Sequence, residues 1–223
     1  MASVLLSVAV VTGCSDGDPS PSQEEAPRPL TSEELDRLAV SRFVLYQTET
    51  VEVQATVSGQ QPVTFNGWVD VADGLGYGVV VTPNGGQGGA FLTAWTDQEV
   101  SAQDTSGTSA PLPPPESGWQ TMPLDPDTST LAAAQVLLVS LAADRPENSQ
   151  LLAQNGAQWL GAGTVDGVVV DIMSGPVEPG ASGGSSSFRY WIDDDGSLLR
   201  VEAMLDGVAW STFDLTPAQG VDL

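Results

Sequence analysis

The sequence predicts an α+β fold in which about eleven antiparallel strands are accompanied by a few helices. Three observations predict this class. Apolar and polar residues alternate with a period of two over several long stretches. Turn-forming pairs such as Asp-Gly and Asn-Gly, and clusters of Ser, Gly and Pro, separate these stretches. A few other stretches lack the alternation and carry the capping residues and composition of helices.

The chain begins with a short apolar run. Residues 2–11 are all apolar or small, and the run closes with Val11-Thr12-Gly13-Cys14. The run is shorter than the roughly 20 residues that cross a bilayer, and it is typical of the hydrophobic region of a secretory signal. A buried strand fits less well, because a polar, proline-rich stretch follows at once. No Lys or Arg precedes the run, so a start upstream of Met1 stays open.

The tetrapeptide that ends at Cys14 resembles the lipobox of bacterial lipoproteins, and Cys14 is the only cysteine of the chain. In that family a diacylglyceryl group, with acyl chains such as palmitate, is attached to the cysteine sulfur, and the peptide before the cysteine is removed. The resemblance implies that residues 1–13 are a signal peptide. It also implies a lipid anchor on the extracytoplasmic face of the cell membrane. A plain secretory signal is the rival interpretation.

The composition limits the partners and the chemistry. The formal net charge is −23, with six Arg, no Lys and no His. Such a surface repels nucleic acid, so we expect no nucleic-acid partner. Arg without Lys, with abundant Ala, Gly, Asp and Val, indicates a GC-rich bacterial genome, which fits an actinobacterial source. Without His or a second Cys, a His-based triad, an HExxH or Cys-rich zinc site and an intrachain disulfide are not available, whereas carboxylate chemistry and hard-cation binding stay open.

We therefore expect a protein that is not an enzyme and that holds no cofactor or metal. The chain has no glycine-rich phosphate loop. A carboxylate-based glycoside hydrolase is a minor alternative, because 29 acidic residues guarantee candidate pairs by chance.

The predicted domain follows a polar spacer. Residues 14–29 are rich in Asp, Ser, Pro and Glu and cannot bury enough apolar surface to fold, so we expect a flexible spacer there. The folded domain then spans residues 30–223. It opens with a helix over residues 30–42, because Thr31 and Glu34 have the spacing of a capping box.

A meander of strands follows this helix. The alternation predicts one long strand over residues 43–57, with Phe43 and Leu45 on its apolar face. Further strands are predicted over residues 63–71, 76–82, 90–96, 98–103 and 119–122. The proline-rich stretch 104–117 is predicted to be a stiff connector.

The second half begins with a helical insert. Residues 131–143 are Ala- and Leu-rich and apolar nearly all round, which predicts a buried helix. A short helix over residues 147–154 follows. Strands are then predicted over residues 157–162, 168–173, 188–193, 197–205 and 208–215.

Two groups of residues have both a structural and a functional interpretation. The run from Asp193 to Gly196 has part of a calcium-loop pattern, but its first ligand position is Trp191, and a hairpin turn fits better. The six Trp residues nearly all fall on or beside predicted strands. The simpler explanation is that these Trp side chains pack on the faces of the sheet. The functional explanation is that some of them line an apolar ligand cavity.

The order of elements resembles the LolA-like family of lipoproteins, including the LppX/LprG group. The shared features are the lipobox at Cys14, an early helix, a long meander, a mid-chain helical insert and C-terminal hairpins. The stretch from Phe188 to Arg200 resembles that family's strand, acidic turn and strand ending in Arg. The resemblance implies a strongly curved half-barrel sheet that wraps a few helices and holds acyl chains between them. It implies no catalytic residues.

Two functions follow from these expectations. The first is a lipid-anchored, non-enzymatic protein that binds or carries a lipid or other apolar ligand in a cavity between sheet and helices. We expect five residues to line this cavity: Val51, Val53, Phe65, Val69 and Leu138. The second is a structural or interaction lipoprotein of the cell surface with a filled core and no ligand.

Overall fold

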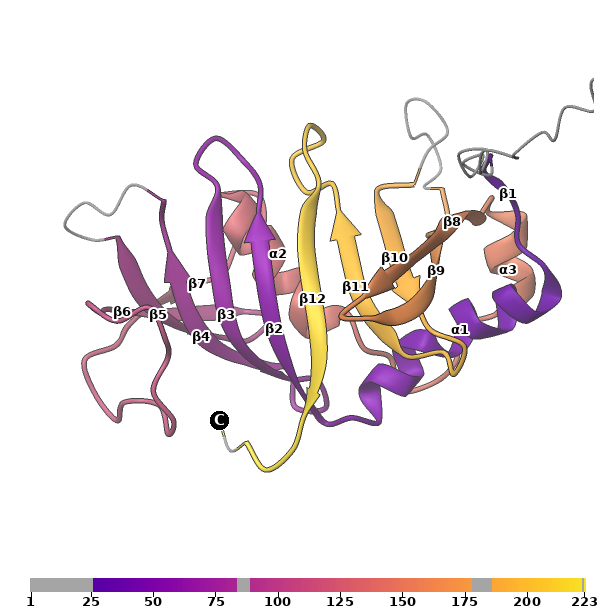
Figure 1. The fold of residues 1–223 in the computed structure, drawn as a ribbon. Coiled ribbons are helices and arrows are strands. Elements are labelled where there is room, and N and C mark those ends of the chain that lie inside the picture. The colour runs from indigo at the N-terminus through magenta and orange to yellow at the C-terminus, as the bar shows by residue number, and fades with distance from the viewer. Residues whose placement is uncertain (1–25, 84–88, 178–185, 222) are drawn as a thin grey trace, which may run out of the picture.

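The computed structural model describes residues 26–83, 89–177, 186–221 and 223. Cys14, the predicted signal peptide and most of the predicted spacer lie outside the described residues. The described chain forms a single antiparallel sheet of 12 strands with three helices (Figure 1). The predicted α+β class with a curved antiparallel sheet is confirmed. The sheet has one strand more than the sequence indicated.

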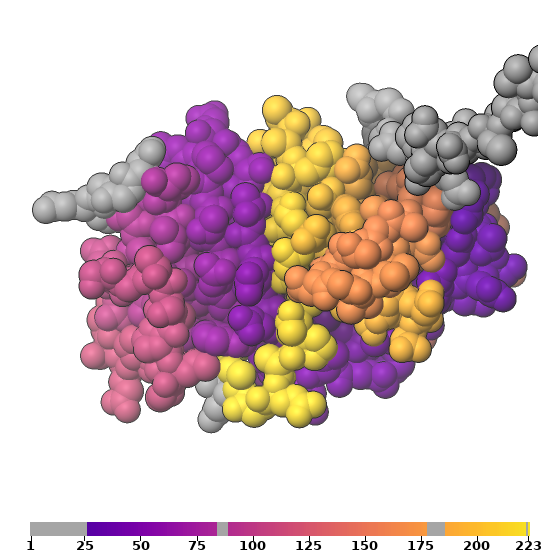
Figure 2. All heavy atoms as spheres, in the orientation of Figure 1, coloured from indigo at the N-terminus to yellow at the C-terminus, as the bar shows by residue number. Residues whose placement is uncertain are grey.

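The strand order places the C-terminal strand in the middle of the sheet, beside β2. Across the sheet the order is β1-β8-β9-β10-β11-β12-β2-β3-β4-β5-β6-β7. The first half of the sheet comprises β2 (Thr50–Val57), β3 (Val63–Asp70), β4 (Leu75–Val81), β5 (Ala90–Trp95), β6 (Glu99–Asp104) and β7 (Gln120–Pro123). The second comprises β1 (Arg28–Pro29), β8 (Gln158–Val165), β9 (Val168–Ser174), β10 (Phe188–Ile192), β11 (Leu198–Ala203) and β12 (Ser211–Ala218). Because β12 pairs with β2 over seven residue pairs, the C-terminal strand joins the two halves of the sheet. Its atoms belong to the yellow column of Figure 2.

The first helix, α1 (Ser32–Tyr46), begins two residues later and ends four residues later than predicted. Thr31 and Glu34 form the expected capping box. The prediction of strand from residue 43 was wrong, because Leu38 and Leu45, two helical turns apart, are both buried and continue the apolar stripe of the helix. The chain turns at Glu49, whose φ is 62°, and β2 begins there.

One face of the sheet is apolar and is covered by the helices. The helix α1 packs on β10 and β11, whereas α2 (Thr130–Ser140) packs on β2, β3 and β4. The short α3 (Ser149–Gln154) packs against α1. In Figure 1, α2 lies behind β2 and β3, and α1 and α3 lie under the other half of the sheet. Within the part of the chain that is described, no helix has the length and apolar character needed to cross a membrane.

Two paired glycines let the sheet bend around an aromatic ring. Gly67 on β3 pairs with Gly78 on β4, and the ring of Phe65 lies over both. A Cβ at Gly78 would approach the Phe65 ring to 2.5 Å, closer than atoms can pack. The missing side chains therefore make room for Phe65 on the covered face.

The opposite face of β3, β4 and β5 is also covered, by the segment 105–119. The Tyr77 hydroxyl donates to the carbonyl oxygen of Pro111 at 2.9 Å, and its ring stacks with Trp68 and meets Trp119 edge to face. Val79 and Leu92 are buried on the same side. The segment predicted as a stiff connector thus forms a second layer, which explains why β4 is apolar on both faces.

Candidate functional site: the covered face of the sheet

The five predicted cavity residues come together on the covered face. Their exposed fractions are 2% for Val51, 0% for Val53, 3% for Phe65, 0% for Val69 and 4% for Leu138. Val51 and Val53 lie on β2, Phe65 and Val69 on β3, and Leu138 on α2. All five belong to one core cluster. Whether they line a cavity that a ligand enters stays a prediction.

The second helix is bound to the sheet through a tryptophan that the cavity prediction did not include. Trp95 on β5 is 2% exposed, and its ring meets Phe65 edge to face at 5.3 Å. Its indole Nε1 donates to the backbone oxygen of Gln135 at 2.8 Å. The Gln135 side-chain Nε2 in turn donates to the Thr93 hydroxyl at 2.9 Å. A lone glutamine in an otherwise apolar helix was the sequence signal for this contact.

Arg42 joins the two long helices across the covered face. From α1 its guanidinium donates to the backbone oxygens of Leu141 at 2.7 Å and Ser140 at 2.8 Å, at the C-terminal end of α2. A cation at this end satisfies free carbonyls and interacts favourably with the helix dipole. Arg42 also forms an ion pair with Glu147 at 2.6 Å. The end of α2 is thus held by one side chain of α1.

A small apolar pocket lies where α1 ends. It has a volume of about 50 Å³ and is formed by the end of α1, the start of β2, the end of β12 and the turn before β11. Of the five predicted cavity residues, only Val51 lines this pocket. The other lining residues are Val44, Leu45, Thr48, Ser197, Leu198, Leu199, Leu215 and Pro217. Ligand pockets measure about 300–1,000 Å³, so this pocket is too small for an acyl chain.

A wider cleft lies at the exposed side of α2. It has a volume of about 590 Å³ and is bounded by Val136, Val139 and Ser140 of α2 and by the turns after β3 and β5. Asp73 and Asp97 line its rim. The apolar side of α2 therefore faces an open cleft.

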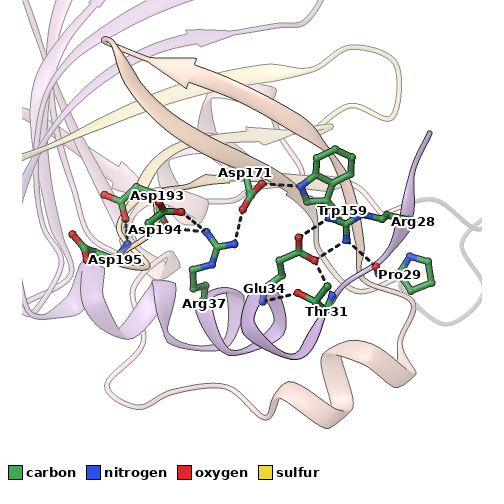
Figure 3. A network of polar contacts seen from close by, with 10 residues as sticks. All are labelled: Arg28, Pro29, Thr31, Glu34, Arg37, Trp159, Asp171, Asp193, Asp194 and Asp195. Atoms are coloured by element: carbon green, nitrogen blue, oxygen red, sulfur yellow. Dashed lines mark hydrogen bonds and ion pairs between the residues drawn. The ribbon is translucent and has the colours of Figure 1, made fainter. Parts of the chain in front are cut away.

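The start of α1 is fixed to the second half of the sheet by a polar network (Figure 3). The Arg28 guanidinium donates two hydrogen bonds to the Glu34 carboxylate, at 2.8 and 2.7 Å, and lies 4.4 Å from the Trp159 ring centre. The hydrogen bonds from Arg28 lower the pKa of Glu34 from 4.5 to about 2. One turn later, Arg37 pairs with Asp171 on β9 at 2.5 Å, and Asp171 accepts from the Trp159 indole at 2.8 Å.

The acidic run from Asp193 to Asp195 forms the hairpin turn that the sequence favoured. Asp193 Oδ1 accepts from the backbone N–H groups of Asp195 and Ser197, and Gly196 has a φ of 84°. Arg37 donates to the Asp193 carbonyl and to the Asp194 carboxylate (Figure 3). Among the described residues, no group of three or more His, Cys, Asp or Glu could hold a metal ion.

The Trp residues have different surroundings. Trp95 belongs to the main core, whereas Trp191 belongs to a separate cluster with Val165 and Val170. Trp210 stacks under the Arg189 guanidinium at 4.0 Å. Packing of sheet faces, the simpler explanation, accounts for the buried ones.

No family model matches this sequence, and no curated protein matches it. Among solved structures, the chain is similar to LprF from Mycobacterium bovis, with 15% identity and a TM-score of 0.50, over 88% of this chain and 97% of that one. It has the fold of LprF. A conserved protein from Thermus thermophilus is more distant, with 10% identity and a TM-score of 0.39, over 81% of this chain and 85% of that one.

The likeness to LprF confirms, at the level of the fold, the resemblance to LppX/LprG-type lipoproteins that the sequence indicated. The two chains match over nearly the whole of both lengths. The half-barrel with helices on its covered face is therefore the architecture shared with LprF.

Proposed function

We propose that this protein is a lipid-anchored, extracytoplasmic and non-enzymatic protein that binds or carries a lipid or other apolar ligand between the sheet and α2. The LprF fold supports this proposal, because it places a large apolar sheet face under short helices. Cys14 would carry the anchor, and the folded domain would stand outside the membrane behind the spacer.

The character of α2 is the observation that carries the proposal. The helix has no charged residue and is apolar on nearly every side. Ala132, Ala134 and Leu138 are buried against the sheet, and Val136 and Val139 border the open cleft. A helix that is apolar all round is stable only when both sides are covered. An apolar ligand that enters beside or beneath α2 would cover the second side.

We expect α2 to move when a ligand enters, because few polar contacts attach the helix to the rest of the domain. Its hydrogen bonds to the rest of the domain come from three side chains, Trp95, Gln135 and Arg42. A shift of α2 would break few polar contacts and would open the space around Leu138. The predicted cavity residues would then line that space.

The second candidate is a structural or interaction lipoprotein with a filled core. The pocket of about 50 Å³ favours it, because this volume is several-fold smaller than that of ligand pockets, about 300–1,000 Å³. In this case α2 would stay in place, and the core around Val53 and Val69 would be permanently filled.

Native mass spectrometry of the protein purified from its own host separates the two candidates. A ligand-bound chain would retain an extra mass that organic extraction removes. A bare chain at the calculated mass would favour the filled core. The blocking variant is Val51→Phe, which narrows the site, and Val208→Phe is its matched control because Val208 is 84% exposed. Ligand should be lost in the first variant and kept in the second.

The anchor is tested separately by metabolic labelling. Labelled palmitate should enter the protein, and Cys14→Ala should abolish both the label and membrane association. Ser20→Ala, in the predicted spacer, is the control that should leave both unchanged. An unlabelled protein whose Cys14→Ala variant stays membrane-bound would refute the anchor.

A further inference from the structure

The arrangement of charge around the point where the tether meets the domain points to the face that contacts the membrane. We propose that α3 and β8, together with Arg145, form a surface that lies against the lipid headgroups of the anchoring bilayer. This inference rests on the proposed lipid anchor and deepens it, because it names how the domain is oriented on the membrane.

The tether joins the domain at a fixed point. Arg28 and Pro29 pair with Trp159 and Gln158 of β8, and Arg28 is held by Glu34 and the Trp159 ring. Residues 15–28 connect this point to Cys14. A flexible chain of this length spans on average about 20 Å. The elements beside β1 therefore spend most time near the bilayer.

Three elements lie near this point: β8, which pairs with β1, the start of α1, which Arg28 contacts through Glu34, and the end of α3. Pro27, just before β1, and Gly156, just after α3, line the same pocket of about 210 Å³. In Figure 1, β1 and α3 both lie at one end of the molecule, and β6 and β7 lie towards the other. The two ends are also the two edges of the sheet, since β1 and β7 are its outermost strands.

One part of the surface at the tether end is uncharged in a protein with a net charge of −23, whereas the start of α1 carries the exposed Glu33 and Asp36. Residues 148–165, which include all of α3 and β8, contain no Asp, Glu, Lys or Arg. Several of their side chains are exposed, and Leu151 on α3 is 54% exposed. An exposed apolar side chain within an uncharged surface can enter the headgroup region without the cost of burying a charge.

A positively charged residue, Arg145, precedes this uncharged stretch in the sequence. Arg145 is exposed and, within the described part of the chain, it has no ion pair or hydrogen bond to another residue. It lines an open cleft of about 580 Å³ together with Leu151 and Arg42 and with the acidic Asp144 and Glu147, of which Glu147 is paired with Arg42. A long side chain of this kind can lay its apolar stem along the surface and present its charge to lipid phosphates.

The opposite end of the molecule is repelled by the same bilayer. Residues 43–143 contain 10 Asp and Glu and no Lys or Arg, and they include β2 to β7 and α2. These residues form most of the purple and magenta half of Figure 2. Anionic headgroups repel this half within a Debye length of about 8 Å. Attraction at one end and repulsion at the other favour a single orientation.

Fluorescence quenching in vesicles tests this orientation. The acylated sulfur of Cys14 cannot react, so one added cysteine can be labelled with bimane. Leu151→Cys places the label on α3, and Met122→Cys places it on β7; these two side chains are 54% and 52% exposed. The vesicles contain phosphatidylcholine and phosphatidylglycerol, with a spin label on a fraction of the headgroups. We expect several-fold stronger quenching at 151 than at 122.

A charge reversal provides a second variant. Arg145→Glu in the Leu151→Cys protein should reduce the quenching at 151 severalfold, whereas Glu99→Lys, at the far end, should not. Circular dichroism confirms that each variant is folded. Equal quenching at both positions, or stronger quenching at 122, would overturn the inference.

The Cys14→Ala form of each labelled protein distinguishes this inference from the anchor. If binding requires Cys14 but quenching is equal at both positions, the surface is refuted and the anchor stands. If the Cys14→Ala chain binds the vesicles as tightly as the acylated chain does, with stronger quenching at 151, the anchor is refuted and the surface stands. If neither form binds vesicles, both are refuted.

Discussion

Replacing Glu34 by Gln should destabilise the domain at neutral pH and have little effect in acid. In the folded protein the Arg28 guanidinium holds the pKa of Glu34 at about 2, against an ordinary value of 4.5. At about 1.4 kcal/mol per pKa unit, this difference is worth at most about 3.5 kcal/mol. The Arg28 side chain is 40% exposed, so solvent screening reduces the expected loss to about 1–2 kcal/mol.

The pH dependence follows from the direction of this shift. A carboxyl group with a lowered pKa in the folded state stabilises that state fully above its ordinary pKa, and the contribution disappears as pH falls towards the folded value. The window for Glu34 is therefore about pH 5 to pH 2. The free-energy difference between wild type and Glu34→Gln should be largest at pH 7 and should shrink through this window.

Urea unfolding monitored by tryptophan fluorescence, at pH 7 and at pH 3, measures the effect. Glu33→Gln is the matched control, because Glu33 lies in the same helical turn and is exposed; it should change the unfolding free energy by less than about 0.5 kcal/mol. A Glu34→Gln variant as stable as wild type at pH 7, or equally destabilised at both pH values, would refute the reasoning.

Three further predictions concern the covered face. Gly76→Ala should lower the free energy of unfolding in urea by about 1–3 kcal/mol, because the new Cβ would overlap the Trp95 ring. Gly163→Ala is the control and should cost much less, because its new Cβ would meet neighbours at ordinary contact distances. Equal losses in the two variants would contradict this packing. Trp95→Phe should cost at least about 1–3 kcal/mol, because it leaves the backbone oxygen of Gln135 without its buried donor; an unchanged midpoint would argue against that bond. Arg42→Met should speed amide hydrogen exchange in α2 more than in β3, and unchanged exchange would mean that the carbonyl contacts do not hold the helix.

Much of the sheet could be predicted because its pattern is local. The alternation in β2 and β3, and the turns that follow them, place Val53 and Phe65 on the same face without reference to the rest of the chain. The capping box of Thr31 and Glu34 likewise needs only four residues. These features were predicted because neighbouring residues alone determine them.

Other features depend on contacts between distant residues and could not be predicted. Phe43 and Leu45 fit a strand or a helix equally well, and only the packing of α1 on β10 and β11 decides for the helix. The bond from Arg42 to Leu141 joins residues 99 positions apart. The strand β1 was missed because two residues carry no periodic pattern, and its pairing with β8 is formed by Trp159, far along the chain.

The candidate site could be predicted only in part, because some of its contacts also join residues that are far apart in the sequence. The apolar face could be predicted from alternation, but the partners that hold α2 over it could not. Trp95 is one of six Trp residues, and nothing in the sequence distinguishes the one whose indole reaches Gln135. The volume of space beneath the helix depends on side-chain packing across four elements.

The Arg28 contact also determines where the protein can be cut without harm. A surface protease that cleaves before Pro27 would release the domain into the medium with Arg28 still covering Trp159. Trimming three residues further would leave Glu34, which is 7% exposed, without its counter-ion Arg28. Shed and anchored forms should therefore melt at the same temperature, whereas a soluble product that starts at Leu30 should melt lower.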